Sequence, residues 1–286
     1  MLKSSNVTAI IVTYKSAAVI EACVKALRDQ AIHVIVVDND SGDSCADKAK
    51  LAGALVTVSS ENLGFGVANN LGAKLAKTDW LLFINPDACA CSGAIDALLQ
   101  GAHAYPDAGM FGPRIIERSN RVFFQAQSLL ATRLHNPKGI LHEPNGDCCV
   151  PKISGACMFM RRDFFQSLGG FDPNIFLFYE DDDLCRRTTD LDRAIIWVNN
   201  AEVHHMRGKS TAQSHRSTFI TRANLAWSRG YVGRKYEVKT NMVRNLAIHL
   251  VKLCAATLTL NLPRMARYGG TCMGAWRSLR RQSHPA

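Results

Sequence analysis

The sequence predicts an α/β protein with a mostly parallel central sheet, helices on both faces of the sheet and a helical C-terminal extension. Within the first 112 residues, short apolar runs rich in β-branched residues alternate with amphipathic stretches of helical period. The runs are apolar throughout, as expected for parallel strands that are covered on both faces. The loops after them are rich in acidic, amide and glycine residues. Ligands of such sheets bind beyond the carboxyl ends of the strands.

The elements of the first half follow one another in a simple order. Strands are predicted at residues 7–13, 33–37, 54–58 and 80–84, and helices at residues 17–28, 45–52 and 67–76. Each helix joins two consecutive strands, which is the connection that parallel strands require. We therefore expect a ligand site in the loops after these four strands.

The rhythm changes after Gly112 to mixed strands and longer loops. Strands are predicted at residues 153–160 and 194–198, a short acidic helix follows residues 176–180, and the pattern is helical from about residue 215. Residues 119–150 show little periodicity, and we interpret them as a mobile acceptor-side or lid region.

The composition is that of an ordinary globular protein, with 286 residues of which 47% are hydrophobic and 20% charged. Nine prolines and 20 glycines are too few for a fibrous or disordered chain,. The N-terminus lacks the basic flank and cleavage site of a signal peptide, so we expect a cytosolic protein. Its ten cysteines are scattered, and we expect reduced, mostly buried thiols.

The net charge of +10 is concentrated near the C-terminus. Residues 234–286 hold ten Lys or Arg and one acid, a balance of +9, whereas the remaining residues hold 24 basic and 23 acidic ones. Within this region, residues 245–262 are apolar but interrupted by His249, Lys252 and Asn261, which argues against a membrane-spanning helix,. A surface helix with basic flanks would instead attract an anionic membrane. The alternative is a helix that packs on the catalytic domain or in a homo-oligomer.

Asn85 to Asp87 directly follow a predicted strand, and the proline between them fixes a turn,. A carboxylate at the mouth of a strand suits Mg²⁺ or Mn²⁺, which can bridge phosphate oxygens; the alternative is a solvated turn residue. His205 is either a further metal ligand or a structural histidine. Arg207 or Lys209 is a candidate phosphate contact.

Two other loops suggest a nucleotide site. Asp38 ends the second strand, where a carboxylate can accept a hydrogen bond from a nucleobase, while Asp40 and Asp43 suit a turn and a helix cap,. The alternative is that all three are only turn residues. Gly64 and Gly66 open a helix but lack the third glycine of the dinucleotide fingerprint and follow the third strand, which disfavours Rossmann chemistry,. These glycines permit a close ligand approach or simply a tight turn.

Four consecutive acids, residues 180–183, begin the predicted acidic helix. At the i,i+4 spacing Asp182 faces Arg186 and Asp183 faces Arg187, while Glu180 and Asp181 lack local partners,. Clustering disfavours full ionisation, so one of these carboxylates can take a proton near neutral pH, as a general base must. The alternative is that these acids only interact with the helix dipole.

Six segments, taken in order, resemble a family 2 glycosyltransferase with a GT-A fold, and specifically its bacterial rhamnosyltransferase-like branch. They are IIVTYKS, VVDNDSGD, ENLGFGVANN, LLFINPDA, ISGACMFMRRDFFQSLGGFDPNIFLFYEDDDLCRR and HHMRGKS. The resemblance covers about residues 6–210. Each segment is short, but six in the correct order make a specific signal.

The resemblance implies a role for each matching residue. The nucleotide base pocket would be lined by Thr13 and Asp38, and the nucleoside would lie near Asn62, Gly64 and Asn69. Asp87 would be the metal-binding acid of a DXD-type motif whose first position holds Asn85, and His205 would be the further metal ligand. Asp181 matches the second residue of the family's Glu-Asp pair, the proposed base, and Glu180 matches the first. The next residue is usually apolar in the family, whereas this chain has Asp182.

The function implied by the resemblance is inverting, metal-dependent sugar transfer. A sugar, with rhamnose from dTDP-rhamnose as the first choice, would pass from a nucleotide-diphosphate donor to a hydroxyl of a glycan or lipid-linked acceptor in cell-surface polysaccharide synthesis. We expect a catalytic domain at residues 1–232, with a nucleotide-binding half to about residue 112 and an acceptor-side half after it. A basic helical extension, residues 233–286, would lie at the cytoplasmic face of the inner membrane.

Two other classes stay open on the residues alone. Another nucleotide-sugar-processing enzyme, such as a pyrophosphorylase, would carry a phosphate loop rich in glycine and basic residues after the first strand, where this chain has Tyr14-Lys15-Ser16-Ala17. A nucleic-acid-binding protein is suggested by the basic tail, but the tail lacks dense aromatic residues. We therefore expect no nucleic-acid partner.

Overall fold

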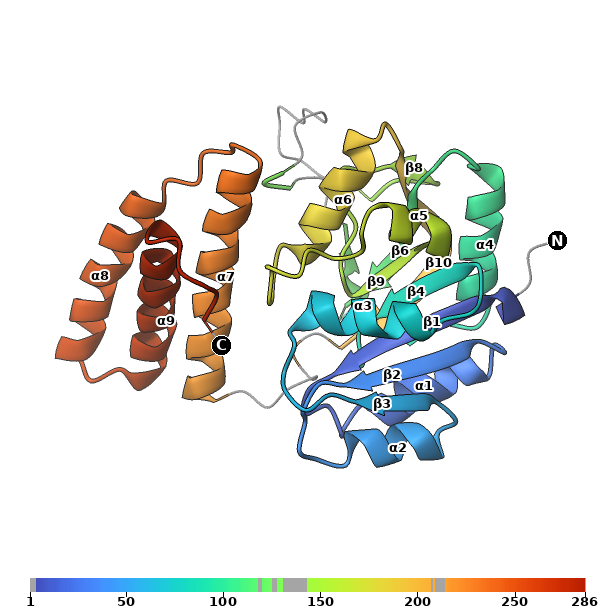
Figure 1. Ribbon diagram of the computed structural model, residues 1–286, viewed down its shortest axis with the longest axis horizontal. Coiled ribbons are helices and arrows are strands. Elements are labelled where there is room, and N and C mark those ends of the chain that lie inside the picture. The colour runs from blue at the N-terminus through green and yellow to red at the C-terminus, as the bar shows by residue number, and fades with distance from the viewer. Residues whose placement is uncertain are drawn as a thin grey trace.

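A single mixed sheet with helices on both faces forms the larger part of the molecule, and three C-terminal helices stand beside it (Figure 1). The computed structural model describes residues 4–117, 120–124, 128–130, 143–206, 208 and 214–285. Half of the predicted lid region, and the predicted phosphate contacts Arg207 and Lys209, lie outside the described residues.

The N-terminal half has the predicted alternation of parallel strands and helices. After a short 3₁₀ turn, η1 (Ser4–Asn6), come β1 (Val7–Thr13), α1 (Ile20–Arg28), β2 (His33–Asp38), α2 (Cys45–Leu51), β3 (Leu55–Val58), α3 (Phe65–Leu75) and β4 (Trp80–Ile84). The strands lie side by side in the order β3-β2-β1-β4 and are parallel. Helix α1 begins later than predicted because the Ser16 carbonyl accepts from the N–H groups of Val19 and Ile20, which forms a turn first.

The second half makes the sheet mixed and curls it. Its elements are β5 (Ala88–Ala90), α4 (Ala94–Ala104), β6 (Met110–Ile116), β7 (Val122–Phe123), β8 (Cys148–Cys149), β9 (Cys157–Arg161), α5 (Arg162–Ser167), α6 (Glu180–Asp190) and β10 (Ile195–His205). The order continues β4-β9-β6-β10-β5, with β9 antiparallel to β4 and β5 antiparallel to β10. Strand β5 thus follows β4 closely in the chain but pairs at the far edge of the sheet.

Two predicted strands in this half differ from the structure. The strand predicted at residues 153–160 begins only at Cys157, and the residues before it form a loop that holds polar contacts. The strand predicted at residues 194–198 is longer and continues to His205. A register shift between Val198 and Glu202 puts polar residues in mid-strand, so the apolar pattern ends before the strand does,.

The core lies on both faces of the sheet. Alternate residues of β1 point to opposite faces: Ala9 and Ile11 belong to one apolar cluster and Ile10 to the other,. Aromatic rings fill both, with Trp80 stacked on Phe159 and Phe83 in contact with Phe165 and Phe171. Burying each large ring contributes about 1.5–3 kcal/mol, so this core holds the strand ends in fixed positions.

The C-terminal helices α7 (His215–Lys235), α8 (Met242–Leu258) and α9 (Leu262–Leu279) lie side by side, with α9 packed against both others (Figure 1). Helix α9 touches the backbone of α7, because a Cβ at Gly274 would lie only 1.9 Å from the Ala223 carbonyl oxygen. Helix α7 continues through the predicted domain boundary between residues 232 and 233.

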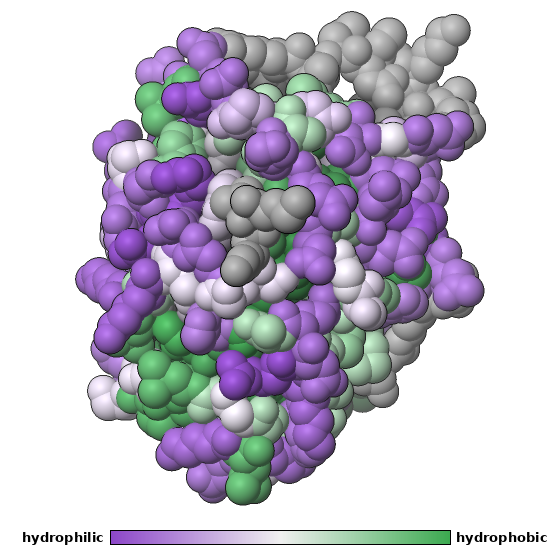
Figure 2. Space-filling model, turned by 90° about the vertical axis from the view of Figure 1, so that its right-hand side faces the viewer, coloured by the Kyte–Doolittle hydropathy of each residue, from purple (hydrophilic) through white to green (hydrophobic). Residues whose placement is uncertain are grey.

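The face of the molecule on the right-hand side of Figure 1 is mostly hydrophilic, with a hydrophobic patch low on its left (Figure 2). In the N-terminal half, Leu51, Leu55 and Val58 of α2 and β3 are among the exposed apolar residues. In the part of the chain that the structure describes, every helix is too short or too polar to cross a membrane.

Candidate active site

The ends of β1 and β2 bring Thr13 and Asp38 together as register neighbours. Both are buried, and the Thr13 hydroxyl has no hydrogen-bond partner among the described residues. One Asp38 carboxylate oxygen accepts from the Ser41 N–H at 3.1 Å. Asp43 caps the next helix, since its carboxylate accepts from the Cys45 N–H at 3.0 Å. A buried carboxylate and a buried hydroxyl without a hydrogen-bond partner among the described residues thus lie at the strand ends, where a nucleotide base was predicted.

Asn39, which was not among the predicted site residues, fixes the neighbouring loop. Its side-chain NH₂ donates to the Asn62 side-chain oxygen at 2.8 Å and to the Gly64 carbonyl at 3.2 Å, and its own oxygen accepts from the Leu63 N–H at 2.8 Å. It joins the loop after β2 to the loop after β3. The signal in the sequence was its place beside Asp38 at the same strand end.

Gly64 and Asn69 belong to the start and middle of α3. Gly64 has φ +78°, and a Cβ there would lie 2.4 Å from the Phe176 carbonyl oxygen, so only glycine fits without strain,. Asn69 is buried, and its side-chain NH₂ donates to the Phe65 carbonyl one turn earlier in the same helix. Gly64 is therefore brought to the Asn39 and Asn62 cluster, whereas the hydrogen bond of Asn69 stays within α3.

Asp87 and His205 meet where β5 pairs with the end of β10. His205 lies opposite Ala88 in the register, and its Nε2 is 3.2 Å from Oδ1 of the buried Asp87. The Asp87 carbonyl accepts from the Met206 N–H at 2.9 Å. The antiparallel pairing of two distant segments thus joins the two predicted metal ligands.

A carboxylate and an imidazole fit a divalent ion that is shared with a substrate. Among the described residues, no group of three or more His, Cys, Asp or Glu is placed to hold a metal by itself. Mg²⁺ and its relatives are commonly held by one or two carboxylates plus substrate phosphates. The residues therefore fit an ion whose other ligands come from a diphosphate, and they do not fit a structural metal site.

The loop before β9 connects this turn to the acidic helix. Asn85 donates its N–H to the Ala156 carbonyl at 3.0 Å, and the adjacent Gly155 donates its N–H to the Asp181 carboxylate at 2.9 Å. Two consecutive residues thus contact both predicted sites. The Asp87 turn and the Asp181 carboxylate lie at one edge of the sheet.

The four acids of α6 have different surroundings. Glu180 is buried, and burial together with the charge of Asp181 raises the pKa of Glu180 well above its usual value. Asp181 is 15% exposed; its oxygens accept from the N–H groups of Gly155 and Asp182, and the Lys152 Nζ lies 3.5 Å away. As predicted, neither Glu180 nor Asp181 has an i,i+4 partner among the described residues.

Asp182 pairs with residues of two other loops and not with Arg186, so that predicted pair is wrong. Its carboxylate accepts from the Lys152 ammonium and the Ser128 hydroxyl, because this side of α6 faces the loop before β9. Arg186 instead pairs with Asp190 at 2.7 Å. Burial raises the pKa of Asp182, and so does the charge of Asp181.

The predicted pair of Asp183 with Arg187 is confirmed, with an N···O distance of 2.7 Å. The fully buried Asp183 also accepts from Lys235 Nζ at 2.5 Å and from the Tyr236 hydroxyl at 2.7 Å. These two residues lie at and just after the end of α7. The helix that carries the acids is therefore bonded to the C-terminal helices.

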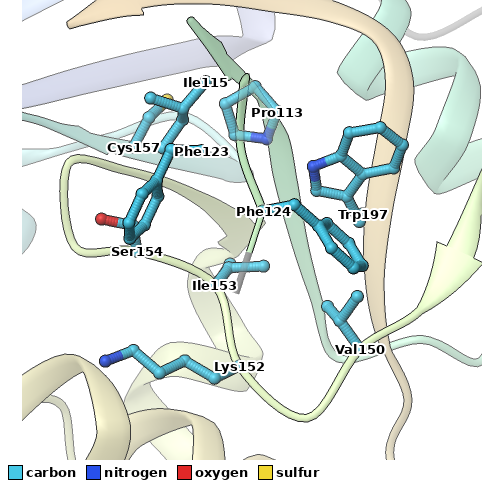
Figure 3. Close-up of a pocket in the computed structure, with 10 residues that line it drawn as sticks. All are labelled: Pro113, Ile115, Phe123, Phe124, Val150, Lys152, Ile153, Ser154, Cys157 and Trp197. Atoms are coloured by element: carbon cyan, nitrogen blue, oxygen red, sulfur yellow. The ribbon is translucent and has the colours of Figure 1, made fainter. Parts of the chain in front are cut away.

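A small pocket lies beside the loop that carries Lys152 (Figure 3). Phe124 and Trp197 form one side, and the Lys152 side chain points away from them. The cavity is only about 20 Å³, which is room for about one water molecule. The Trp197 indole N–H at its wall is buried without a hydrogen-bond partner among the described residues. The cavity itself is too small to hold a sugar ring,.

Comparison with known proteins decides the family. Residues 8–169 match the family described as Glycosyl transferase family 2. The chain belongs to this family. It is 30% identical over 229 residues to the N-acetylglucosaminyl-diphospho-decaprenol L-rhamnosyltransferase of Mycobacterium tuberculosis (strain ATCC 25618 / H37Rv), covering 67% of this chain and 75% of that protein. It is therefore a glycosyltransferase of the rhamnosyltransferase-like branch, and the pyrophosphorylase alternative is set aside.

Solved structures show the same fold at lower identity. The mannosyltransferase PcManGT from Pyrobaculum calidifontis, in complex with GDP-Man and Mn²⁺, is 17% identical with a TM-score of 0.58 over 96% of this chain and 87% of that one. S. aureus TarS 1-349 is 12% identical with a TM-score of 0.56, covering 98% and 92%. The predicted GT-A fold, with its central sheet, flanking helices and C-terminal helices, is confirmed.

Proposed function

We propose that this family 2 glycosyltransferase transfers rhamnose from dTDP-rhamnose, with inversion, to a hydroxyl of a lipid-linked glycan acceptor in cell-surface polysaccharide synthesis. One observation carries the proposal: residues 155 and 156 join the Asp181 carboxylate to the Asp87 turn. A base at Asp181 and a diphosphate at Asp87 would therefore lie side by side. The rhamnosyltransferase relative, whose name gives an N-acetylglucosaminyl-diphospho-decaprenol acceptor, supports the choice of sugar and acceptor.

The donor nucleotide would lie on the ends of β1 and β2. Asp38 would accept a hydrogen bond from the base. The Thr13 hydroxyl, which has no hydrogen-bond partner among the described residues, would contact the same ring. Asn62, Gly64, Asn69 and Asn85 shape the nucleoside and diphosphate path, with Gly64 allowing close backbone approach,. The catalytic domain would comprise residues 1–232.

Asp87 and His205 would hold Mg²⁺ or Mn²⁺ together with the donor diphosphate. The bound ion would stabilise the charge that develops on the leaving diphosphate. The buried position of Asp87 and its 3.2 Å contact with His205 support these two ligands. The Mn²⁺ in the PcManGT complex supports a divalent ion of this class.

Asp181 would act as the general base. Its carboxylate accepts the proton of the acceptor hydroxyl while the oxygen bonds to the anomeric carbon and the bond from that carbon to the diphosphate breaks. Attack opposite the leaving group inverts the configuration, and no covalent enzyme intermediate forms. The two N–H groups that hold Asp181 support this role, because they fix the carboxylate while leaving it partly exposed.

The decisive experiment is product analysis. Purified enzyme with a divalent ion and a panel of nucleotide sugars is given an N-acetylglucosaminyl-diphospho-polyprenol acceptor, and the product is identified by mass spectrometry and its anomeric configuration by NMR. We expect rhamnosylated product with inverted configuration from dTDP-rhamnose. A retained configuration would contradict the mechanism, and preference for another sugar would contradict the donor.

We also propose peripheral association with an anionic membrane at the cytoplasmic face. In α8 only Met242 and Ala256 are buried. Six exposed residues of this helix recur at helical spacing and therefore lie on one side of it. We call this side the α8 apolar face; it consists of Val243, Ala247, Leu250, Val251, Cys254 and Leu258. Arg244 and Lys252 of the same helix, and Arg264 and Arg267 of α9, are also exposed. An apolar face among basic residues suits a helix lying in a lipid interface.

A further inference from the structure

A groove lies between α7 and α8, apart from the candidate active site. Its volume is about 710 Å³, within the range of pockets that hold small ligands. Apolar side chains form much of its wall: Val238, Met242, Val243, Ala247 and Leu279. A ligand in this groove would contact apolar surface over much of its length.

Three arginines also line the groove: Arg234 of α7, Arg244 of α8 and Arg281, which follows α9. The lining contains no acidic residue, and none of the three arginines forms an ion pair with an acid that the structure describes. Such a concentration of positive charge attracts an anion, and guanidinium groups bind phosphate oxygens in fixed geometry.

The position of Arg234 is fixed before any ligand binds. Its guanidinium donates to the Ser278 carbonyl at 2.8 Å and to the Ser278 hydroxyl at 2.9 Å. Burial and the nearby charge of Arg281 lower the pKa of Arg234. An anion between the two guanidinium groups would relieve their repulsion.

The groove is continuous with the α8 apolar face, because Val243 and Ala247 belong to both. A ligand that matches the whole surface therefore has an apolar chain and an anionic head. A soluble sugar or nucleotide would leave the apolar face uncovered. Membrane phospholipids have both parts, which favours a lipid as the occupant.

We propose that this groove binds the phosphate headgroup of an anionic membrane lipid, whose acyl chains lie along the α8 apolar face. The proposal rests on the peripheral membrane association proposed above and adds a defined headgroup site. Diffuse attraction depends only on how much basic charge is near the surface. A headgroup site depends instead on which arginines are present.

The test compares two variants of equal charge. The test variant, R244Q/R281Q, removes two groove arginines whose side chains have no hydrogen bond or ion pair among the described residues. The control variant, R264Q/R267Q, removes two exposed arginines of α9 that lie outside the groove lining. Sedimentation with phosphatidylcholine vesicles, with and without phosphatidylglycerol, measures binding by the full-length protein. We expect the groove variant to lose about tenfold more affinity than the α9 variant, because charge-assisted hydrogen bonds are lost as well as charge.

The outcomes separate the two proposals. Equal losses in the two variants overturn the headgroup site while leaving peripheral association intact. Failure of the unmodified protein to bind the anionic vesicles overturns the association itself. Glycerol phosphate is added as a soluble headgroup probe against sodium chloride of equal ionic strength. We expect glycerol phosphate to displace the protein from the vesicles more than the matched salt does, because it competes for the headgroup site; equal displacement by the two would contradict a phosphate-specific site.

Discussion

Residues 180–183 are four consecutive acids whose side chains have different surroundings. Burial raises the pKa of Glu180, so this side chain stays protonated at pH values above its ordinary pKa. The carboxylates of Asp182 and Asp183 instead form ion pairs and accept hydrogen bonds from hydroxyl groups. Asp181 is held mainly by backbone N–H groups and is partly exposed. Of the four, Asp181 is the one best placed to receive a proton from a substrate.

Asp181→Asn should abolish transfer while donor binding is largely preserved, because an amide cannot accept the acceptor proton. A general base contributes about 10²- to 10⁴-fold, which sets the expected loss of kcat. Product formation and calorimetric donor binding are the two measurements. Asp182→Asn is the matched control and should stay active; if this variant is the inactive one and Asp181→Asn is not, the base is Asp182.

Glu180→Gln should alter how stability depends on pH. Because the folded-state pKa of Glu180 is raised above its ordinary value of 4.5, the unfolded chain releases this proton at lower pH than the folded protein. Stability therefore falls as pH rises above about 4.5 and on through the folded-state pKa. Glutamine removes this loss, so the stability of the variant relative to the unmodified protein should increase from pH 5 to pH 8 in urea unfolding. If the free energies of unfolding of the two proteins change with pH in parallel, the pKa of Glu180 is not raised in the folded protein.

Asp87→Ala and His205→Ala should both weaken donor binding when Mg²⁺ or Mn²⁺ is present. Each removes one of the two protein ligands that meet at 3.2 Å, and the diphosphate then binds the ion with fewer protein contacts. Calorimetry with and without the ion measures the effect, which should disappear in EDTA. Transfer that survives EDTA would remove the metal from the proposed mechanism.

At the scale of elements, the starts of α3 and α4 offer a matched comparison. Gly64 and Gly93 both precede a helix with positive φ, +78° and +81°, but a Cβ at Gly64 would meet the Phe176 carbonyl at 2.4 Å, whereas nothing lies within 4 Å of a Cβ at Gly93. The two glycines also differ in ψ, which is 176° at Gly64 and −4° at Gly93. The comparison therefore combines the packing of α3 against the loop before α6 with a backbone region that essentially only glycine adopts.

Gly93→Ala should lose about 1–2 kcal/mol from the left-handed backbone alone. Gly64→Ala should lose more and should also raise the KM for the donor, because the Phe65 N–H bond to Phe176 at 2.9 Å must shift. Urea unfolding and donor kinetics of both variants are the measurements. Equal destabilisation with an unchanged KM would show that this contact does not position α3.

At the scale of the whole molecule, the basic charge of the C-terminal region and the α8 apolar face lie outside the candidate active site. The last 53 residues carry +9 of the net +10, and the α8 apolar face is exposed. Cutting the chain within α7 is a poor test of this region, because Lys235 and Tyr236 bond to Asp183 of the acidic helix. Surface substitutions are the better test.

V251S/L258S should weaken binding to phosphatidylglycerol vesicles by about tenfold or more, since burial of each apolar side chain is worth about 1.5–3 kcal/mol. L51S/L55S is the control on the N-terminal half: Leu51 is 89% exposed, close to 87% for Leu258. The control should bind as the unmodified protein does. A similar loss in both variants would show that α8 is not the membrane-facing element.

The N-terminal half of the sheet, and the acids at its edge, could be predicted from local patterns in the sequence. Strands β1 and β4 begin and end at the predicted residues because each is a fully buried apolar run, and burial on both faces leaves a signal within the run itself. Asp38 and Asp87 were identified as candidates on the same basis, since Asp38 ends one apolar run and Asp87 lies in the turn directly after another.

Which of these side chains contact one another depends on how distant segments pack in the folded protein. The contacts of His205 with Asp87, Gly155 with Asp181 and Lys152 with Asp182 depend on the curl that brings β5 to β10 and on the loop before β9. No local pattern encodes them: residues 199–202 interrupt the apolar run of β10, and the i,i+4 spacing favoured Arg186 for Asp182. Spacing along a helix fixes only neighbours on that helix, whereas a buried carboxylate pairs with whatever cation the packing of distant segments brings to it.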